Sequence, residues 1–470
     1  MHVFAIDLRS LALLRVGLAL LLLGDALLHG ADFAVFYGER GVLPVAQLPL
    51  VGGGGAFSLH TYASGSPPLL WLLFGVQLGA ALALLVGWQT RVASGLCWLL
   101  LASAQLRNPF LAYSGADRLL RLLLFWAMFL PLGARFSLDA RRAGREPAGE
   151  VLSVASAALL LQLGIVYWSN GLNKLVAAEW IEGNALERAL GVTFFGGRFG
   201  PWLAQQGWLM KPGAWGTVAF EILAPCFAFV PWRTDWLRLA TVAVLIGFHI
   251  VLMGAFDIGW FPLVCSVAWL AFLPGVFWEA LPGGRALRGR LPQPVALEIM
   301  SGALLAWLIV YVAAGHLGIA LPGLVRAPGA ALRLTQHWGQ FEVVSPIDFW
   351  PRLRGTTVAG AAVDPLLGGP PAPARPARAA DLFPHFRWRI YFYNLLQRAI
   401  DKPSDPTLEP LVGEVATTLC RRWNAAHTGR DALAHVRIAL VAEVFEATQP
   451  LPPTELFVLE QRCQRDARAP

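Results

Sequence analysis

Apolar stretches of about 20 residues recur through the first two thirds of this sequence. A helix needs roughly 20 mostly apolar residues to cross the hydrocarbon core of a bilayer. We therefore predict eight or nine membrane-spanning helices, of which the third and fourth are short and poorly separated. The predicted segments are residues 9–29, 68–87, 91–106, 118–133, 151–171, 214–231, 236–253, 258–280 and 297–320.

Composition supports this interpretation. Hydrophobic residues make up 56% of the 470 residues and charged residues only 14%, against about 25% in soluble domains. Charged residues number 36 in residues 1–320 and 31 in the much shorter stretch 321–470. This composition argues against a soluble enzyme and excludes a disordered chain. We predict an all-α polytopic membrane domain, residues 1–320, followed by a mixed β/α extracytoplasmic domain, residues 321–470.

The C-terminal domain contains patterns of both strands and helices. Weak alternation and β-branched residues in 331–363 favour strands. The Pro-rich segment 365–378 is typical of a linker or flexible loop. Helical periodicity predicts amphipathic helices at 386–399, 408–426 and 431–446, the last two packing on each other.

Short basic loops predict the orientation in the membrane, because such loops remain in the cytoplasm. With nine spans, all of these loops fall on one side of the bilayer, so we expect a cytoplasmic N-terminus. Residues 30–67, 172–213 and everything after 320 then lie outside, and 172–213 is rich enough in Trp to lie in the interface. The net charge of +7 thus orients the chain in its lipid bilayer, and no nucleic-acid partner is expected. The loop residues are Arg135, Arg141, Arg142, Arg145, Arg233, Arg285, Arg288 and Arg290.

The chain has 34 arginines but only three lysines, so each lysine needs a reason. Lys174 lies at the end of the fifth predicted span. Arginine keeps its proton in proteins, whereas a desolvated lysine loses it. Lys174 is therefore either a base that needs a neutral amine or a snorkelling residue that anchors the helix end. Both interpretations remain open on these residues alone.

Two residues lie on the same helical face as Lys174. Asn170 has a side chain that donates to a bound oxygen, and Gly171 allows another group to approach closely. Glu221 falls inside the sixth span, where a carboxylate is costly and indicates function. Pro225, four residues later, removes a backbone donor to the carbonyl of Glu221.

Further polar residues lie near the predicted outer ends of the spans. His249 by itself is more often a satisfied core residue than a catalyst, and Arg15 is expected to snorkel. Asn108, Lys174, His249 and Asp257 all fall in the outer half, together with Asp117, whereas Glu221 is expected deeper. Such a cluster fits a lipid-soluble substrate. The residues assigned to its binding site are Asn108, Asp117, Asn170, Glu221, His249 and Asp257.

The five cysteines show no metal-binding spacing, and no metal is expected. Cys97, Cys226 and Cys265 lie in apolar runs and are interpreted as small core residues. Cys420 and Cys463 lie in the predicted outer domain, where oxidising conditions permit a disulfide between them. Two free buried thiols are the alternative.

Several motifs resemble those of the horizontally transferred transmembrane (HTTM) domain family, bacterial relatives of the vitamin K-dependent γ-carboxylase. The most specific are Tyr167–Leu175, which reads YWSNGLNKL, and Phe248-His249 with IGWFP at 258–262. The likeness covers most of residues 1–350 in the same order. Its other parts are 14–17, 36–44, 107–109, 115–117, 129–139, Trp180, Gly183, Gln336, Trp338, Phe341, Ser345 and Pro346.

The resemblance implies an oxidative reaction at a quinol. In the carboxylase, the lysine in this Gly-x-x-Lys-Leu context removes a proton from reduced vitamin K, oxygen adds, and the resulting alkoxide prepares a carbon for CO2. Lys174 occupies that position as the catalytic base, and His249 would line the same pocket. The implied substrates are a menaquinol-type naphthoquinol, O2 and CO2, with a glutamyl protein or peptide as a candidate partner.

One departure separates this chain from the animal enzyme. Pro109 follows Asn108 where the animal enzyme has an Asn-His pair. Epoxidation of the quinol is therefore expected, while carboxylation of glutamate remains open. The alternative is a non-catalytic lipid- or quinone-binding anchor whose outer domain recruits a partner protein.

Overall fold

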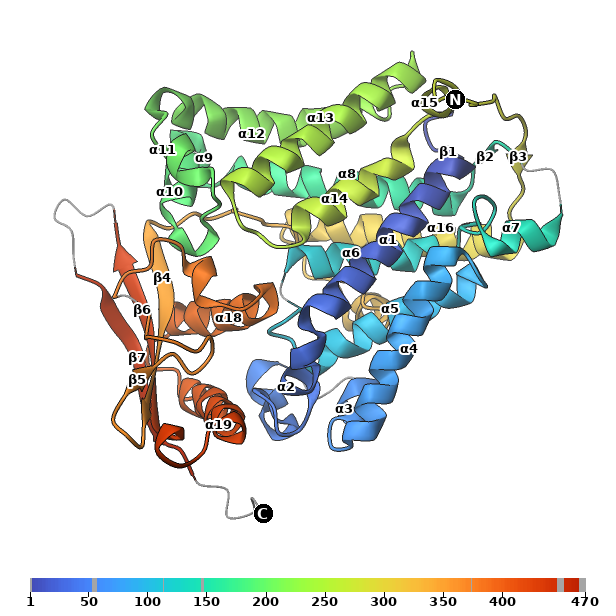
Figure 1. Ribbon diagram of the computed structural model, residues 1–470. Coiled ribbons are helices and arrows are strands. Elements are labelled where there is room, and N and C mark those ends of the chain that lie inside the picture. Colours follow the sequence, from blue (N-terminus) through green and yellow to red (C-terminus); the bar gives the residue numbers. More distant parts are fainter. Residues whose placement is uncertain are drawn as a thin grey trace.

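A computed structural model of the chain describes residues 2–52, 57–112, 114–144, 148–372, 374–445 and 452–464. It consists of a large helical part and a smaller α/β domain at the C-terminus (Figure 1). The N-terminus lies at the end of the helical part that is far from the α/β domain. We call this the N-terminal end, and the opposite one the domain end.

Each predicted apolar segment overlaps a helix, although 118–133 is helical only to Ala127 and 258–280 is divided among several short helices. Among the described residues, five helices are long and apolar enough to cross a membrane, namely those that begin at Leu8, Pro67, Val154, Thr234 and Val295. The others are shorter or less apolar, so the predicted number of eight or nine spans is not confirmed. The helices are α1 (Leu8–His29), α4 (Pro67–Val86), α5 (Thr90–Arg107), α6 (Gly115–Ala127), α8 (Val154–Lys174), α12 (Gly207–Phe227), α13 (Thr234–Ala255), α14 (Phe261–Trp269) with η4 (Leu270–Phe272), and α16 (Val295–His316).

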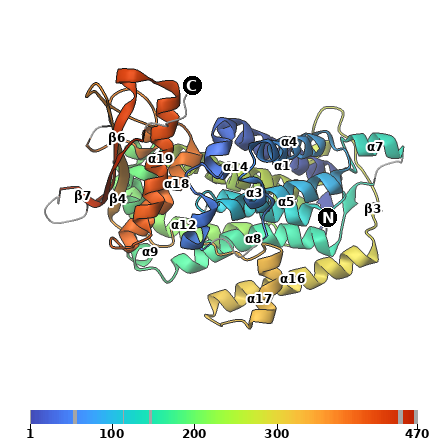
Figure 2. The ribbon, with the colours of Figure 1, turned by 90° about the horizontal axis from the view of Figure 1, so that it is seen from below.

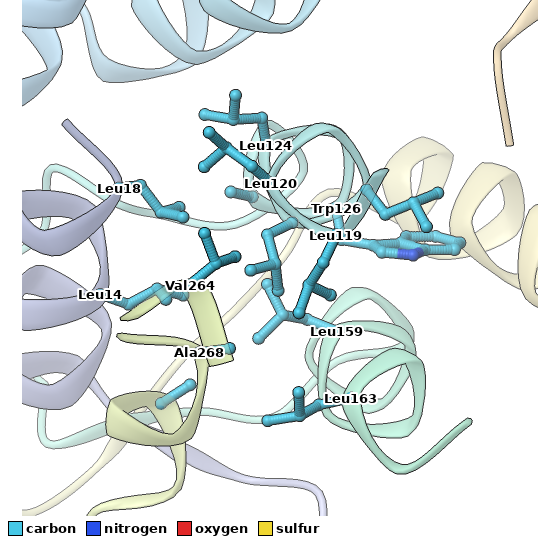
Figure 3. Packing of buried hydrophobic residues seen from close by; sticks show 14 of the residues in the cluster. Leu14, Leu18, Leu119, Leu120, Leu124, Trp126, Leu159, Leu163, Val264 and Ala268 are labelled. Carbon is cyan, nitrogen blue, oxygen red and sulfur yellow. The ribbon is translucent and has the colours of Figure 1, made fainter. Parts of the chain in front are cut away.

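The core of the helical part lies where α1, α6, α8 and α14 meet (Figure 3). Leu14 of α1, Leu119 of α6, Leu159 of α8 and Val264 of α14 interdigitate there, each at most 1% exposed. Helix α6 is buried on nearly all sides. Helix α16, by contrast, lies at one edge, where most of its surface is exposed (Figure 2). Helix α8, which carries Asn170 and Lys174, contributes many buried residues to this core.

The N-terminal end collects the basic loops on one side, as predicted. A small sheet at this end joins the chain start to the loops before α8 and α16, and Arg290 lies in one of its strands. Arg145 lies outside the described residues. The elements at this end are β1 (Ile6–Asp7), β2 (Glu150–Val151), β3 (Arg290–Leu291), α7 (Leu138–Ala143) and α15 (Gly275–Glu279).

Arg15 does not snorkel, so that expectation is wrong. Its side chain is 1% exposed and donates hydrogen bonds to the carbonyl oxygens of Leu132, Arg135 and Phe136 at 2.7–3.2 Å. It ties α1 to the turn after α6, because a guanidinium reaches several acceptors at once. Cys226 is also not a core residue: it is exposed on α12, whereas Cys97 and Cys265 are buried as predicted.

The domain end of the helical part is built from short helices. Those in residues 178–204 expose Trp202, and Trp208 at the start of α12 is 76% exposed. Trp is favoured at membrane surfaces. The elements are η1 (Gly30–Asp32), α2 (Phe33–Tyr37), η2 (Val45–Val51), α3 (Leu59–Ala63), α9 (Ala178–Glu182), α10 (Ala185–Gly191), η3 (Thr193–Phe195) and α11 (Gly200–Ala204).

The C-terminal domain is an antiparallel sheet covered by two helices. The strand order is β5-β4-β6-β7, and Trp350 pairs with Val441 at its centre. The helices pack between the sheet and the helical part (Figure 1). The elements are β4 (Ile347–Thr357), β5 (Ala362–Val363), η5 (Ala379–Leu382), α18 (Phe386–Asp401), α19 (Leu408–Ala426), η6 (Gly429–Asp431), β6 (Leu433–Val444) and β7 (Thr454–Arg462).

Two predictions for this domain are wrong. Residues 433–444 form the central strand β6, not a helix, because a short apolar run fits either period and pairing on both edges decides for the strand. Residues 331–346 contain no strand. The described part of the Pro-rich segment 365–378 also has no regular element, and Trp350 and Arg352 of β4 bind its Ala374 carbonyl.

A disulfide between Cys420 and Cys463 joins helix α19 to the residue that follows β7.

Residues 323–346 return into the helical part before the sheet begins, and we call them the return segment. Its helix α17 (Gly323–Ala331) packs on α16, where Trp307 donates to the Val325 carbonyl. Further along, the Gln336 and Gln162 side chains bond each other, with 2.7 Å from Gln162 Nε2 to Gln336 Oε1. The return segment therefore lies against α8, beside the residues singled out in the sequence.

Candidate functional site

Three polar residues share one face of α8. Tyr167, Asn170 and Lys174 are spaced by three and four positions, which places them one above the other along the helix. All are at most 4% exposed. The helix reaches Lys174 because Ser153 and Ser156 form a capping box at its start. Each of the three side chains meets a partner from a different part of the chain.

Lys174 forms a buried ion pair with Glu221 of α12. Its Nζ lies 2.7 Å from Oε2 and 3.0 Å from Oε1 of Glu221, and it also lies 5.1 Å from the centre of the Trp180 ring. Lys174 is 2% exposed, which excludes the snorkelling alternative. Glu221 meets Lys174 directly, so it does not form the separate, deeper group that the sequence led us to expect.

Gly171 brings α12 to this position. A Cβ at Gly171 would lie 2.6 Å from Cγ1 of Ile222 and 3.4 Å from Cβ of Glu221. Only a residue without a side chain permits this approach. The group for which Gly171 makes room is thus α12 itself, and α12 continues as a helix past Pro225 to Phe227.

Tyr167 anchors a second polar chain. Its hydroxyl lies 2.5 Å from Nε2 of His249 on α13 and accepts a hydrogen bond of 2.8 Å from the indole of Trp269. His249 is 1% exposed. Its other ring nitrogen, Nδ1, is buried without a hydrogen-bond partner among the described residues. His249 therefore offers an unused polar atom inside the helical part.

Asn170 holds the return segment in place. Its Oδ1 accepts a hydrogen bond of 2.8 Å from the backbone of Gln340. The side chain of Gln340 extends to Gly115 of α6, where a Cβ would lie 2.6 Å from Gln340 Nε2 and 3.1 Å from the ring of Phe261. Gln340 Oε1 is buried and has no partner in the described part of the chain. This contact uses only the Oδ1 acceptor of Asn170, so its role as a donor through Nδ2 stays a prediction.

Two neighbours of Lys174 also bind the return segment. Asn173 donates to the Trp338 carbonyl at 2.7 Å, and the indole of Trp180 donates to the Phe341 carbonyl at 2.8 Å. The sequence did not indicate Gln340 or Tyr167 as site residues. Gln340 lies in a segment without regular structure, so no periodic pattern marks it. Tyr167 was visible only as part of the motif around Lys174.

The other predicted site residues lie in different contacts. Asn108 donates to the Phe36 carbonyl at 2.9 Å. Asp117 and Asp257 each bind an arginine of the C-terminal domain, Arg387 and Arg389 respectively. The structure thus joins Lys174 and Glu221 directly. Asn170 lies on the same face of α8 as Lys174, and His249 contacts that face through Tyr167. The structure places the remaining three at the boundary between the two parts of the molecule.

Arg387 is the centre of that boundary. It binds Asp117 of α6 and also Asp25 of α1, with Nη2 2.7 Å from Asp25 Oδ2. A cavity of about 20 Å³ adjoins these groups, which is room for a water molecule. It is lined on its polar side by Asp25, His29, Tyr37, Gln77, Gln105, Asp117 and Arg387.

The chemistry that these residues offer is proton transfer. Among the described residues, no group of three or more His, Cys, Asp or Glu side chains is placed to hold a metal ion. The arrangement instead provides a buried amine-carboxylate pair and two unpartnered polar atoms, His249 Nδ1 and Gln340 Oε1. Groups of this kind accept, hold or donate protons and hydrogen bonds.

Comparison with known proteins identifies one domain. The family model described as "HTTM domain" matches residues 56–276, a stretch that contains α3 through η4 and with them Lys174, Glu221 and His249. No curated protein and no solved structure matches the chain. The polar face of α8 and the helices that supply its partners thus lie inside the matched region. Residues 56–276 of this chain are an HTTM domain, as the motifs around Lys174 and His249 predicted.

Proposed function

We propose that this protein is an integral membrane enzyme that removes a proton from a lipid-soluble hydroquinone at the Lys174–Glu221 pair. The observation that carries the proposal is the burial of this pair in the HTTM domain. HTTM domains are linked to the vitamin K-dependent carboxylases. An ionisable pair in an apolar environment is costly to keep, and such residues are retained mainly for function.

The pair works as a single base. Lys174 and Glu221 together carry no net charge whether the proton between them rests on the amine or on the carboxylate. When the pair accepts a proton from a hydroquinone hydroxyl, it becomes singly positive and stabilises the oxyanion left behind. This attraction is strong because the surrounding medium has a low dielectric constant.

The unpartnered atoms supply the other end of the binding site. A hydroquinone has two oxygens on opposite sides of an aromatic ring. His249 Nδ1 and Gln340 Oε1 are buried and lack partners among the described residues, and Phe261 lies beside both side chains. These residues suit the second oxygen and the ring, which is the fit that a naphthoquinol requires.

The proposed reaction takes the hydroquinone and O2 to the quinone epoxide and water. Coupled carboxylation would add CO2 to a glutamyl side chain of a protein or peptide held by the C-terminal domain. The proposed orientation has the N-terminus in the cytoplasm and the C-terminal domain outside. The collection of basic loops at the N-terminal end supports it.

The test is an assay of purified protein with reduced naphthoquinone and O2, in which epoxide is measured by liquid chromatography and mass spectrometry. Lys174→Ala, Lys174→Arg and Glu221→Gln should each lower the rate at least about 100-fold, the usual size of general acid–base effects. Lys211→Arg is the matched control. Lys211 also lies 5.1 Å from a Trp ring centre, that of Trp215, but it is exposed.

Two results would defeat the proposal. One is the absence of epoxide from the unaltered protein. The other is full activity in Lys174→Arg, since an anchoring charge tolerates arginine and a proton acceptor does not. Either result would leave the non-catalytic anchor as the function of the HTTM domain.

A further inference from the structure

Arg333 occupies a position that normally belongs to glycine. It ends α17 with φ at +54°. The amide of Leu334 donates to the Gly329 carbonyl at 2.8 Å, and that of Arg333 to the Ala330 carbonyl at 3.3 Å. This pattern closes a helix with a left-handed residue, for which glycine is preferred. A larger residue costs about 1–2 kcal/mol there, so its side chain is expected to have a use.

The guanidinium of Arg333 also lacks partners. Its Nε is buried without a hydrogen bond, and no hydrogen bond or ion pair reaches the rest of the group from the described residues. The residue as a whole is half-buried, and fully buried arginines of this chain differ in this respect. Arg107 donates to the Leu43 and Gly38 carbonyls, and Arg15 to three carbonyls. Arg333 is therefore not one more link between backbone segments.

Two further arginines approach the same place from α6. Arg121, which is 5% exposed, donates to the Arg333 carbonyl at 3.0 Å. Arg118, one turn earlier, donates to the His337 carbonyl. The charges of Arg118 and Arg333 both repel that of Arg121. In the described part of the chain no ion pair joins Arg121 or Arg333 to a carboxylate, and Asp117 is already bound by Arg387.

Large apolar side chains are exposed where the chain passes from α16 to α17. Leu317 is 72% exposed, Ile319 55% and Leu324 90%. Leu317 and Ile319 follow α16 and Leu324 lies in the first turn of α17, and these two helices lie together at one edge of the molecule (Figure 2). Arg121 is the seventh residue of α6, so it lies about 9 Å along that helix from its domain end. Positive charge and exposed apolar surface thus lie in the same half of the bundle, and α17 connects the two.

We infer that Arg333, with Arg118 and Arg121, binds the phosphate of an anionic phospholipid whose acyl chains lie along α16 and α17. A phosphate oxyanion supplies the missing negative charge and accepts several guanidinium hydrogen bonds at once. Free phosphate would supply the charge as well. It would leave Leu317, Ile319 and Leu324 uncovered, which is why the structure favours the lipid.

The experiment measures the unfolding temperature of the full chain in a neutral maltoside detergent. Short-chain phosphatidylglycerol, short-chain diacylglycerol and inorganic phosphate are added separately at equal concentration. Phosphatidylglycerol should raise the unfolding temperature by about 2–4 °C near saturation, and the other two should raise it by less than half as much. Arg333→Gly should abolish the rise, and this variant is expected to fold because glycine suits a positive φ.

Arg326→Gln is the matched control, because Arg326 is exposed on the same short helix. It should keep the full rise with phosphatidylglycerol. An equal rise with diacylglycerol, or an unchanged rise in Arg333→Gly, would overturn the inference. An equal rise with inorganic phosphate would overturn the assignment to a lipid. None of these outcomes depends on quinol chemistry, so the proposed function can fail without affecting them.

Discussion

Arg387 of the C-terminal domain binds both oxygens of Asp117 in the HTTM domain, with nitrogen–oxygen distances of 2.8 Å for each. Two of its remaining donors bind Asp25 of α1, and the third binds the Leu111 carbonyl. Two other aspartates at the domain end, Asp32 and Asp257, hold His385 and Arg389 from the same stretch of chain. The start of α18 is therefore fixed to α1, α6 and the loop after α13 by charged hydrogen bonds.

The Arg387 contacts predict a large loss of stability when the guanidinium is removed. Arg387→Ala leaves Asp25 and Asp117 buried without their partner, which should cost about 3–5 kcal/mol. The measurement is thermal unfolding in detergent. Arg375→Ala is the control, because Arg375 is 53% exposed in its pair with Glu443 and should change stability by about 1 kcal/mol or less. Equal losses in the two variants would contradict the prediction.

Gly171→Ala should separate α8 from α12. The added methyl group meets Cγ1 of Ile222 at 2.6 Å, and such overpacking typically costs about 1–3 kcal/mol. The proposed epoxidase activity should fall with it, since Lys174 and Glu221 move apart. Adding Ile222→Ala to Gly171→Ala should restore much of the lost stability and much of the lost activity. Gly75→Ala on α4, where the methyl group meets open space, should be harmless; destabilisation there as well would argue against a specific contact at Gly171.

Asp348 should make stability depend on pH. Burial raises the pKa of its carboxyl above the usual value, although Thr193 and Phe349 donate hydrogen bonds to it. The folded chain then holds this proton more tightly than the unfolded chain. The contribution of Asp348 to stability is thus greatest below about pH 4 and falls as pH rises through the folded-state pKa. Asp348→Asn should remove this slope, measured as unfolding temperature between pH 3.5 and 7.

Asp405 provides a control of opposite sign for that experiment. Hydrogen bonds from the backbone and hydroxyl of Thr407 lower the pKa of its carboxyl. Its contribution is therefore present above the unfolded-state value of about 4 and lost as pH falls. Asp405→Asn should leave the pH dependence of the unfolding temperature unchanged near neutral pH. Below about pH 4 it should reduce the fall of the unfolding temperature with decreasing pH. Parallel profiles for Asp348→Asn and the unaltered protein would show that Asp348 does not set the slope.

The Cys420–Cys463 disulfide predicts a defined pattern of thiol labelling. Alkylation of the unfolded, unreduced protein should modify three cysteines, Cys97, Cys226 and Cys265, and reduction should raise the number to five. Mass spectrometry reads both numbers directly. The double Ser variant should lose about 2–4 kcal/mol of stability, whereas Cys226→Ser on the exposed face of α12 should lose almost none. Five labelled cysteines before reduction would exclude the bond.

Long apolar segments were predictable because a single physical requirement, the thickness of the hydrocarbon core, determines them. The pair of Lys174 and Glu221 was not, although both residues were singled out. They are 47 positions apart, and no local pattern connects two helices across that distance. The strand at 433–444 was mistaken for a helix because its pairing partners lie in β4 and β7, far away in the sequence.

The preference for arginine was visible in the composition, but its reason was not. We interpreted arginine as a plain carrier of charge. Arg15, Arg107 and Arg238 are instead each buried, and each donates to two or more backbone carbonyls from segments far apart in the chain. A lysine ammonium has no planar fork to span such acceptors. The structure thus explains the scarcity of lysine through geometry and not through charge alone.

The return segment also bears on how the protein is made. Ribosomes finish α8 and α12 long before they reach Gln340, so a nascent chain exposes this face of α8 until the return segment has been synthesised. The return segment, residues 323–346, packs against that face only after α16 has been inserted. A product that ends before Gln340 would keep the Lys174–Glu221 pair but would leave Asn170 and Asn173 without their partners in the return segment, and these unpaired amides are a feature by which membrane quality control would distinguish it from the longer form.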